Sequence, residues 1–359
     1  MSSNTTLSTH KYQALDSLRG IAALMVVFQH FWEMNNPSDA RLKPWLFFCA
    51  GHEAVILFFV LSGFVLSHQL RNFEFHQYQQ FVLRRILRIY PAYYVALAFS
   101  ATLLIYISHY HPATLAQYGL TPWFYIWSRS NFDTSMWLSS LSLISHEGNS
   151  LNVATWSLFY EMWLSLVFPL LIIYCIRSKW IIRLTILCSL AIVSYYFWRF
   201  GNFLDNQWQS IIYYGWYFIA GMYLYHYNYR LKFSASWLWL IIGCALYFSN
   251  YLLFGKIASR MFHEILIAIG SCLIVINCLY FAPLKRLLNI TLFRFYGKIS
   301  YSLYLFHLPI IYALGYLYLP HGSLLVVKFL TIILSTLIAW ISYVLIEQTF
   351  IKLAKKYVN

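Results

Sequence analysis

Charged residues are scarce in this chain. Only 10% of its 359 residues are Asp, Glu, Lys or Arg, whereas 61% are hydrophobic and 21% are aromatic. A soluble domain carries about a quarter charged residues, so this chain has too few to cover a surface that faces water. Long apolar runs recur along its whole length and indicate an all-α, polytopic membrane protein.

Other signals are missing as well. No CxxC pair occurs, and every cysteine falls in or beside an apolar run, which favours buried reduced thiols over a disulfide framework or a metal site. The six are Cys49, Cys175, Cys188, Cys244, Cys272 and Cys278. The net charge of +14 is spread over short loops and is not gathered in one basic patch, so we expect no nucleic-acid partner.

The N-terminal residues show no signal-peptide pattern. Residues 1–14 are polar, and no small-residue cleavage site follows the first apolar run, so we expect that run to be a retained helix. No stretch has the composition of a linker or a repeat. The sequence therefore predicts a single membrane domain over 1–359, with a short polar tail at 1–14 and a basic tail at 347–359.

About ten apolar runs are long enough to cross a bilayer, which takes about 20 residues each. They are 17–36, 50–69, 89–108, 155–176, 180–199, 208–227, 235–254, 262–282, 299–319 and 323–346. With the N-terminus in the cytoplasm, 18 of the 25 Lys and Arg residues fall on the cytoplasmic side. This bias predicts cytoplasmic N- and C-termini.

Two segments depart from the pattern of short loops. Residues 70–88 are too polar to span, and their second half is predicted to form an amphipathic helix at the interface. Residues 109–154 form a long outer loop rich in Trp, Tyr and Ser. Loops of this length are usually functional or disordered, and the aromatic content favours a lid or a surface that faces sugars.

The first apolar run, LDSLRGIAALMVVFQHFWEM, carries four ionisable groups: Asp16, Arg19, His30 and Glu33. On a helix, the 11 residues from Arg19 to His30 return to nearly the same face, about 16 Å along the axis. All four groups can therefore line one stripe, and ionisable groups within a membrane usually face a protein interior or a water-filled cavity. The alternative is that both pairs simply mark the two ends of the helix.

Four later segments contain further polar groups within or beside apolar runs. They are FFVLSGFVLS with Ser62, RRILRIYPAYY with Arg84, Arg85 and Arg88, TWSLFYEMW with Trp156 and Glu161, and SYSLYLFHLP with His307. Each segment alone is a weak signal, whereas their order and spacing together are specific.

This set of segments resembles the acyltransferase type 3 family of integral membrane enzymes over nearly the whole chain. The family's Arg-x10-His signature matches Arg19 and His30, and its Arg-x-x-Arg signature matches Arg85 and Arg88. One departure is visible: the family often ends its last helix with Glu-x-Pro, and this chain has Glu347-Gln348-Thr349. That departure leaves the end of the helix, and any role for Glu347, open.

The resemblance implies transfer of an acyl group, commonly acetyl, from cytoplasmic acyl-CoA to a hydroxyl of an extracytoplasmic glycan. Lipopolysaccharide O-antigen, exopolysaccharide and lipid-linked sugars are the acceptors that it suggests, and the bacterial inner membrane is the location. No permanently bound cofactor is expected, since acetyl-CoA is a donor substrate. Guanidinium groups bind phosphates well, so Arg84, Arg85, Arg88 and Arg19 are assigned to CoA. The alternative for this cluster is topology and contact with lipid phosphates.

His30, Glu161 and Arg19 are the predicted catalytic residues, and His30 is the one assigned to the reaction itself. Its imidazole could act as a general base on the acceptor hydroxyl or could take the acyl group itself, and the sequence leaves both routes open. Glu33 and Asp16 are assigned orienting roles. A salt bridge between Asp16 and Arg19 is the alternative for that pair.

The remaining polar groups are assigned to the substrate side: His307, Trp156 and Ser62. Helix packing is the alternative for Ser62, since no GxSxG elbow exists to activate it. Ring packing is the alternative for His307, and a buried pair is the alternative for Glu161. Loop tryptophans, among them Trp123, Trp127 and Trp137, could stack on sugar rings. His52 and Glu53 are expected to sit among lipid headgroups.

A competing hypothesis is a proton-coupled transporter or flippase of a glycan or organic ion, with His30, Glu161 and Arg19 along its path. Transporters tend to show repeated halves with broken helices, and this sequence shows no such symmetry. The paired Arg-x10-His and Arg-x-x-Arg motifs are also unexpected there. The acyltransferase reading is therefore preferred, with an acyl-CoA donor, a glycan acceptor and membrane lipids as partners.

Overall fold

The computed structural model describes residues 12–35, 44–108, 118–129, 133–144, 151–200, 207–232, 235–252 and 260–357. Every element within these ranges is helical. A bilayer core offers no water to backbone N–H and C=O groups, and a helix satisfies them internally. Five helices of the described residues are long and apolar enough to cross a membrane: Gly51–Gln69, Phe75–Ile107, Val153–Arg177, Met261–Tyr280 and Leu324–Tyr357. The prediction of an all-α, polytopic membrane protein is confirmed, whereas the sidedness of the termini stays a prediction.

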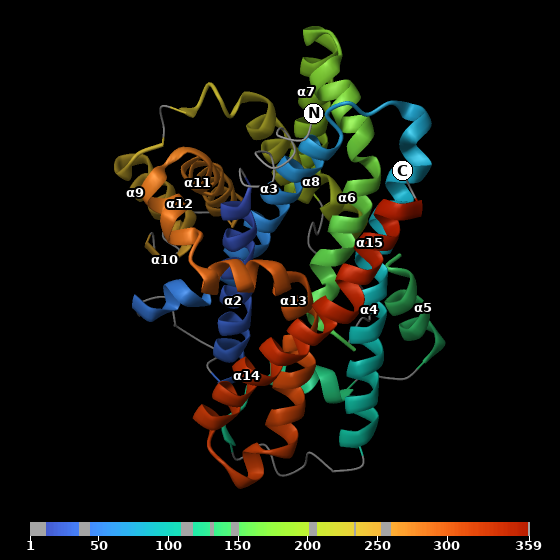
Figure 1. Ribbon diagram of the computed structural model, residues 1–359, viewed down its shortest axis with the longest axis vertical. Helices are drawn as coiled ribbons and strands as arrows, with labels where there is room; N and C mark the ends of the chain where they lie inside the picture. The colour runs from blue at the N-terminus through green and yellow to red at the C-terminus, as the bar shows by residue number, and fades with distance from the viewer. Residues whose placement is uncertain are drawn as a thin grey trace. The chain divides into compact units, whose positions relative to one another are not determined.

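The chain forms two compact units. The first unit consists of Met1–Ala54, Leu83–Trp156 and Leu288–Asn359. Its helices are α2 (Gln13–Asn35), most of α4 (Tyr78–Ser108), α5 (Thr134–Ser142), α13 (Thr291–Leu317), α14 (Leu324–Ser342) and α15 (Gln348–Tyr357). Figure 1 shows α13 beside α2 and α14, and these two are its main helix neighbours.

The second unit consists of Val55–Val82 and Ser157–Leu287. It holds most of α3 (Gly51–Gln69) and α6 (Trp156–Ile172), followed by α7 (Trp180–Phe200), α8 (Gln207–Tyr227), α9 (Trp237–Tyr247), α10 (Ser249–Leu252), α11 (Arg260–Tyr280) and α12 (Ala282–Leu288). Small residues let its helices approach closely. A Cβ on Gly221 would lie 2.0 Å from the Val60 carbonyl oxygen, and one on Gly270 would lie 2.5 Å from the Tyr247 nitrogen.

Glycines also set the approach of α2 to α13 in the first unit. A Cβ added to Gly20 would lie 2.5 Å from the backbone nitrogen of Gly297, and one added to Gly297 would lie 2.6 Å from the Asp16 carbonyl oxygen. Ten residues further along each helix, the rings of His30 and His307 stack. The two helices therefore run in the same direction and keep one register between these two contacts.

Several helix limits differ from those expected. Residues 78–88 are part of α4 and do not form a separate interfacial helix, because the helix continues without a break through Pro91. The run at 235–254 is divided into α9 and α10 around Phe248. The outer loop contains α5, whose N-cap Asp133 accepts a hydrogen bond from the Met136 nitrogen at 2.7 Å. The C-terminal tail is helical as far as Tyr357.

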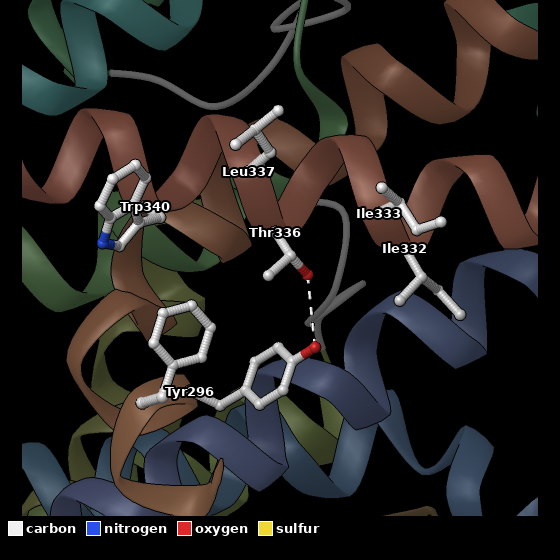
Figure 2. A pocket seen from close by; sticks show the side chains of 7 residues that line it. Tyr296, Ile332, Ile333, Thr336, Leu337 and Trp340 are labelled. Carbon is white, nitrogen blue, oxygen red and sulfur yellow. Dashed lines mark hydrogen bonds between the residues drawn. The ribbon is translucent and has the colours of Figure 1, made fainter. Parts of the chain in front are cut away.

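A groove of about 420 Å³ opens between α13 and α14, lined by Phe295, Tyr296, Ile332, Ile333, Thr336, Leu337 and Trp340. Figure 2 shows the Tyr296 hydroxyl directed at Thr336, and their oxygens are 3.4 Å apart. The other lining side chains are apolar. None of the residues predicted to act in the functional site lines this groove, so the groove is not the predicted site.

Replacing Gly20 by alanine should destabilise the protein. The added methyl group meets backbone atoms of α13 that have no freedom to move aside, and overpacking of this kind costs about 1–3 kcal/mol. We expect a lower midpoint of thermal unfolding in detergent, followed by circular dichroism. Gly215→Ala is the matched control, because its Cβ meets only the end of the Leu164 side chain at 3.3 Å. Equal midpoints for the two variants would contradict this account.

Candidate functional site

The end of α2 gathers three polar side chains on neighbouring helical positions. His30 and Glu33 are three residues apart, and Nδ1 of His30 lies 2.8 Å from Oε2 of Glu33. Gln29 donates from Nε2 to the other carboxylate oxygen at 2.9 Å. A carboxylate only accepts, so Nδ1 carries the hydrogen and Nε2 is left as the ring atom available for chemistry. The His30 side chain is 14% exposed.

Two aromatic rings stack on the His30 imidazole. The Trp123 ring lies 5.1 Å away between centroids, tilted by 8°. The His307 ring lies 5.2 Å away on α13, tilted by 23°. The sequence did not indicate that Trp123 and His307 both stack on His30, and it suggested a sugar as the stacking partner of Trp123. The loop tryptophan and the two histidines therefore belong to one site.

His307, on α13, is fully buried beside His30. Its Nδ1 lies 3.1 Å from the Leu303 carbonyl oxygen one turn earlier, and a carbonyl only accepts, so the hydrogen is on Nδ1. Its Nε2 has no hydrogen-bond partner among the residues that the structure describes. A buried nitrogen lone pair is thus left beside His30.

The 3₁₀ segment Pro122–Arg129 is held against the end of α2. Thr121 donates to the Glu33 carbonyl from its hydroxyl at 2.6 Å and to the Met34 carbonyl from its backbone nitrogen at 3.0 Å. These are carbonyls of the last turn of α2, which have no partner within the helix. The Trp123 ring also packs on Tyr312 of α13, with centroids 5.7 Å apart. The hydrogen bonds of Thr121 therefore cap α2 and also hold the segment that carries Trp123.

A second polar cluster lies near the start of α2. Arg19 and Arg88 lie near both Asp16 and Glu347 and attract their carboxylates. Arg85, on the same helix as Arg88, is 7% exposed, whereas Arg84 is exposed. The structure thus brings together the two arginine motifs of the sequence. It also supports the electrostatic pairing of Asp16 with Arg19 that the sequence left open.

Glu347 joins this cluster because the helix after α14 is locally wider. Tyr343–Glu347 form a π-helical turn, and α15 continues from Gln348 where a proline would have interrupted the hydrogen bonds. The carboxylate is 8% exposed and accepts from the Ser302 nitrogen at 3.1 Å and from the Ser302 hydroxyl. The missing Pro therefore changes the helix end without removing the carboxylate from the interior.

Trp156 begins α6 directly after a segment that is tied to α13. Tyr304 donates to the Ala154 carbonyl at 2.6 Å, and the Asn152 amide donates to the Leu305 carbonyl at 2.7 Å. Trp156 itself is half-buried. Its assigned role toward a substrate stays a prediction.

Ser62 and Glu161 lie in the second unit, where they meet. The Ser62 hydroxyl lies 3.5 Å from Oε1 of Glu161, and Ser62 is 4% exposed. A glycine neighbour of Ser62, Gly63, packs directly on the Phe218 backbone. This close approach is consistent with a packing role for the segment, and both the substrate-binding assignment of Ser62 and the catalytic assignment of Glu161 stay predictions.

The sequence reasoning missed one buried acid in the second unit. Glu264 on α11 is fully buried and accepts from Tyr213 and from Tyr217, the latter at 2.8 Å, both on α8. Its position inside the predicted span 262–282 was a visible signal, because a carboxylate within a membrane needs hydrogen-bond donors. His263 beside it is 6% exposed.

The first unit therefore has polar groups at two levels along α2: the arginine cluster near its start, and His30 with its stacked rings near its end. The helical rise places them about 16 Å apart. Near the end of α2, the Nδ1 of His30 is hydrogen-bonded to a carboxylate, which is the arrangement of a general base or a nucleophile. Near the start of α2, the guanidinium groups are suited to binding phosphate.

Comparison with known proteins agrees with these motifs. The profile of a family described as "Acyltransferase domain" matches residues 12–344. The "Putative acetyltransferase ORF330" of Acidianus two-tailed virus is 27% identical over 319 residues, covering 85% of each chain. No solved structure shows significant similarity.

Two partial matches have more specific names. The "Peptidoglycan O-acetyltransferase OatA" of Listeria monocytogenes is 27% identical over 221 residues, which cover 58% of this chain and 30% of that protein. The "O-acetyl transferase" of Shigella phage Sf6 is 32% identical over 83 residues, covering 23% of this chain and 24% of that protein. Both names describe O-acetyl transfer, and the first gives peptidoglycan as its acceptor.

Replacing Glu347 by alanine should lower stability more than replacing it by glutamine. Alanine leaves the buried N–H of Ser302 without its carboxylate acceptor, at a cost of about 1–3 kcal/mol, whereas the glutamine amide oxygen can still accept. Thermal unfolding of the purified protein measures the difference. If Glu347→Ala unfolded at the temperature of the parent, the carboxylate would have no structural role at this position.

Proposed function

The chain belongs to the acyltransferase family whose profile it matches over residues 12–344, and from that premise we propose its reaction. It transfers an acyl group, in the first instance acetyl, from cytoplasmic acyl-CoA to a hydroxyl of an extracytoplasmic glycan. The observation that carries the proposal is the 2.8 Å contact between His30 Nδ1 and Glu33. This contact leaves Nε2 as the reactive atom of a histidine that matches the family signature.

In the general-base route, His30 Nε2 takes the proton of the acceptor hydroxyl as its oxygen attacks the thioester carbonyl. The C–S bond then breaks, and the proton passes from His30 to the CoA sulfur, giving CoA and an ester. Glu33 keeps the hydrogen on Nδ1 and stabilises the cationic ring that forms between the two steps.

In the acyl-histidine route, Nε2 attacks the thioester carbonyl, the C–S bond breaks and CoA leaves as the thiolate, so the acylated ring is positively charged. The glycan hydroxyl then attacks the acyl group on the ring, and the CoA thiolate takes the proton that the acceptor hydroxyl gives up. Both routes use the same atoms of His30 and Glu33, and both pass through a positively charged ring.

The arginine cluster supplies the donor site in this proposal. The phosphates of CoA are recognised by Arg85 and Arg88, with Arg84 and Arg19 beside them, because guanidinium groups bind phosphate oxygens through paired hydrogen bonds. The pantetheine arm then extends along α2 and brings the thioester to His30. The acyl group thereby reaches the acceptor while the nucleotide stays at the arginine level.

The acceptor approaches His30 from the side of the loop that carries Trp123. A glycan acceptor is supported by the name of one partial relative, a peptidoglycan O-acetyltransferase. Lipopolysaccharide O-antigen, exopolysaccharide and lipid-linked sugars are the acceptor classes that we propose for this chain. Its membrane is then the bacterial inner membrane, where cytoplasmic acyl-CoA and such acceptors meet.

His30→Ala should abolish transfer, and Glu33→Ala should reduce it in part. Loss of a general base or nucleophile removes about 10²–10⁴-fold in kcat, and Glu33→Gln should lose less than Glu33→Ala because the amide oxygen still accepts from Nδ1. Release of free CoA from acetyl-CoA by purified protein in lipid, with a panel of glycans, measures the rates. Full turnover by His30→Ala would overturn the assignment of the reaction to this histidine.

Arg85→Ala should raise KM for acetyl-CoA about tenfold or more while kcat changes little, since the lost contact is to the nucleotide phosphates. The effect should disappear with acetyl-pantetheine, a donor that has no phosphate. Arg294→Ala is the control, because Arg294 is an exposed arginine of the first unit outside the cluster. An equal effect of Arg85→Ala on both donors would show that Arg85 does not bind phosphate.

A further inference from the structure

Trp123 faces the ring that changes charge during the proposed reaction. Its indole lies 5.1 Å from the His30 imidazole, and the planes are only 8° from parallel. A nearly parallel arrangement presents the face of the indole, which carries the negative end of its quadrupole, and not its positive edge. A cation within about 6 Å of such a face is attracted to it, most strongly when the ring is tryptophan.

The other ring that stacks on His30 does not compete for this role. His307 is fully buried, its Nδ1 hydrogen is directed at the Leu303 carbonyl, and its Nε2 has no acceptor among the described residues, so burial favours a neutral ring against His30. Glu33 is the acidic group in contact with the His30 ring, and it acts in the ring plane through Nδ1. The cationic ring is therefore stabilised in its plane by a carboxylate and above its plane by an indole.

Trp123 is also held in place before any substrate arrives. Thr121 binds two carbonyls of α2, and the neighbouring Phe124 is fully buried against Tyr312 and Tyr316 of α13. The indole itself packs on Tyr312. A group fixed in this way stabilises a developing charge without reorganising during the reaction.

We propose that Trp123 is a positioning residue that clamps the His30 ring and stabilises its positively charged state by a cation–π interaction. The inference rests on the proposed role of His30, and it holds for either route, because the ring becomes cationic by gaining a proton or by gaining an acyl group. It also means that one face of this indole is occupied by the catalytic histidine and is not a platform for sugar.

The first test compares Trp123→Phe with Trp123→Leu. Leucine lacks a π face, so we expect kcat to fall about tenfold, equivalent to about 1.4 kcal/mol, with KM for the glycan unchanged. Phenylalanine retains a face and should keep most of the rate. Thermal unfolding shows whether each variant is folded. A raised glycan KM at unchanged kcat would instead assign Trp123 to sugar binding and overturn the clamp.

A second test keeps the shape of the side chain. Tryptophan analogues with increasing numbers of ring fluorines, introduced at position 123 alone, weaken the negative face of the ring while the packing is retained. The clamp predicts that log kcat falls stepwise with the number of fluorines. An unchanged kcat across the series would show that Trp123 acts by packing only.

His30→Ala in the same assay separates the two hypotheses. If it is inactive while the fluorine series has no effect, the clamp fails and the proposed function stands. If it is fully active, the proposed role of His30 is wrong, and the clamp that rests on this role is wrong with it, whatever the kcat of Trp123→Leu. An inactive His30→Ala together with a stepwise fluorine effect supports both.

Discussion

The close approach of α2 and α13 is the constraint on which the site depends. Gly20 and Gly297 bring the two backbones together, and no larger side chain fits between them. The helices run in the same direction, so a contact near the start of α2 also sets which side chains meet near its end. There His30 and His307 stack, and Met34 reaches Gly315. Gly20 and Gly297 lie far from the His30 ring, yet the approach that they allow determines that His307 packs against this ring.

Ionisable groups within a membrane protein need partners, and the first unit supplies them at two levels. At one level, Arg19 and Arg88 are set against Asp16 and Glu347. At the other level, His30 is bound to Glu33, which is also bound to Gln29. Between the two, α2 contributes mainly apolar residues. The separation suits the proposed reaction, in which a phosphate-rich carrier and a hydroxyl acceptor have to be held apart yet share one acyl group.

The segment around Trp123 contributes both to the packing of α2 and to the proposed chemistry. Its backbone contacts cap the end of α2, its Phe124 fills a space beside Gly315, and its indole covers His30. The second unit has its own paired acids, the half-buried Glu161 with Ser62 and the buried Glu264 with two tyrosines, so paired polar groups occur in both units.

The sequence by itself determined the helical membrane architecture and the alignment of Arg19 with His30 and of His30 with Glu33, because each follows from composition or from the period of one helix. It did not determine that α4 runs unbroken through Pro91, or that Glu347 turns inward at a π-helical turn. Only the tertiary structure decided that Trp123 and His307 stack on His30. These residues are far apart in the chain, and their meeting depends on helix packing and on a loop docked on α2, which no local pattern records.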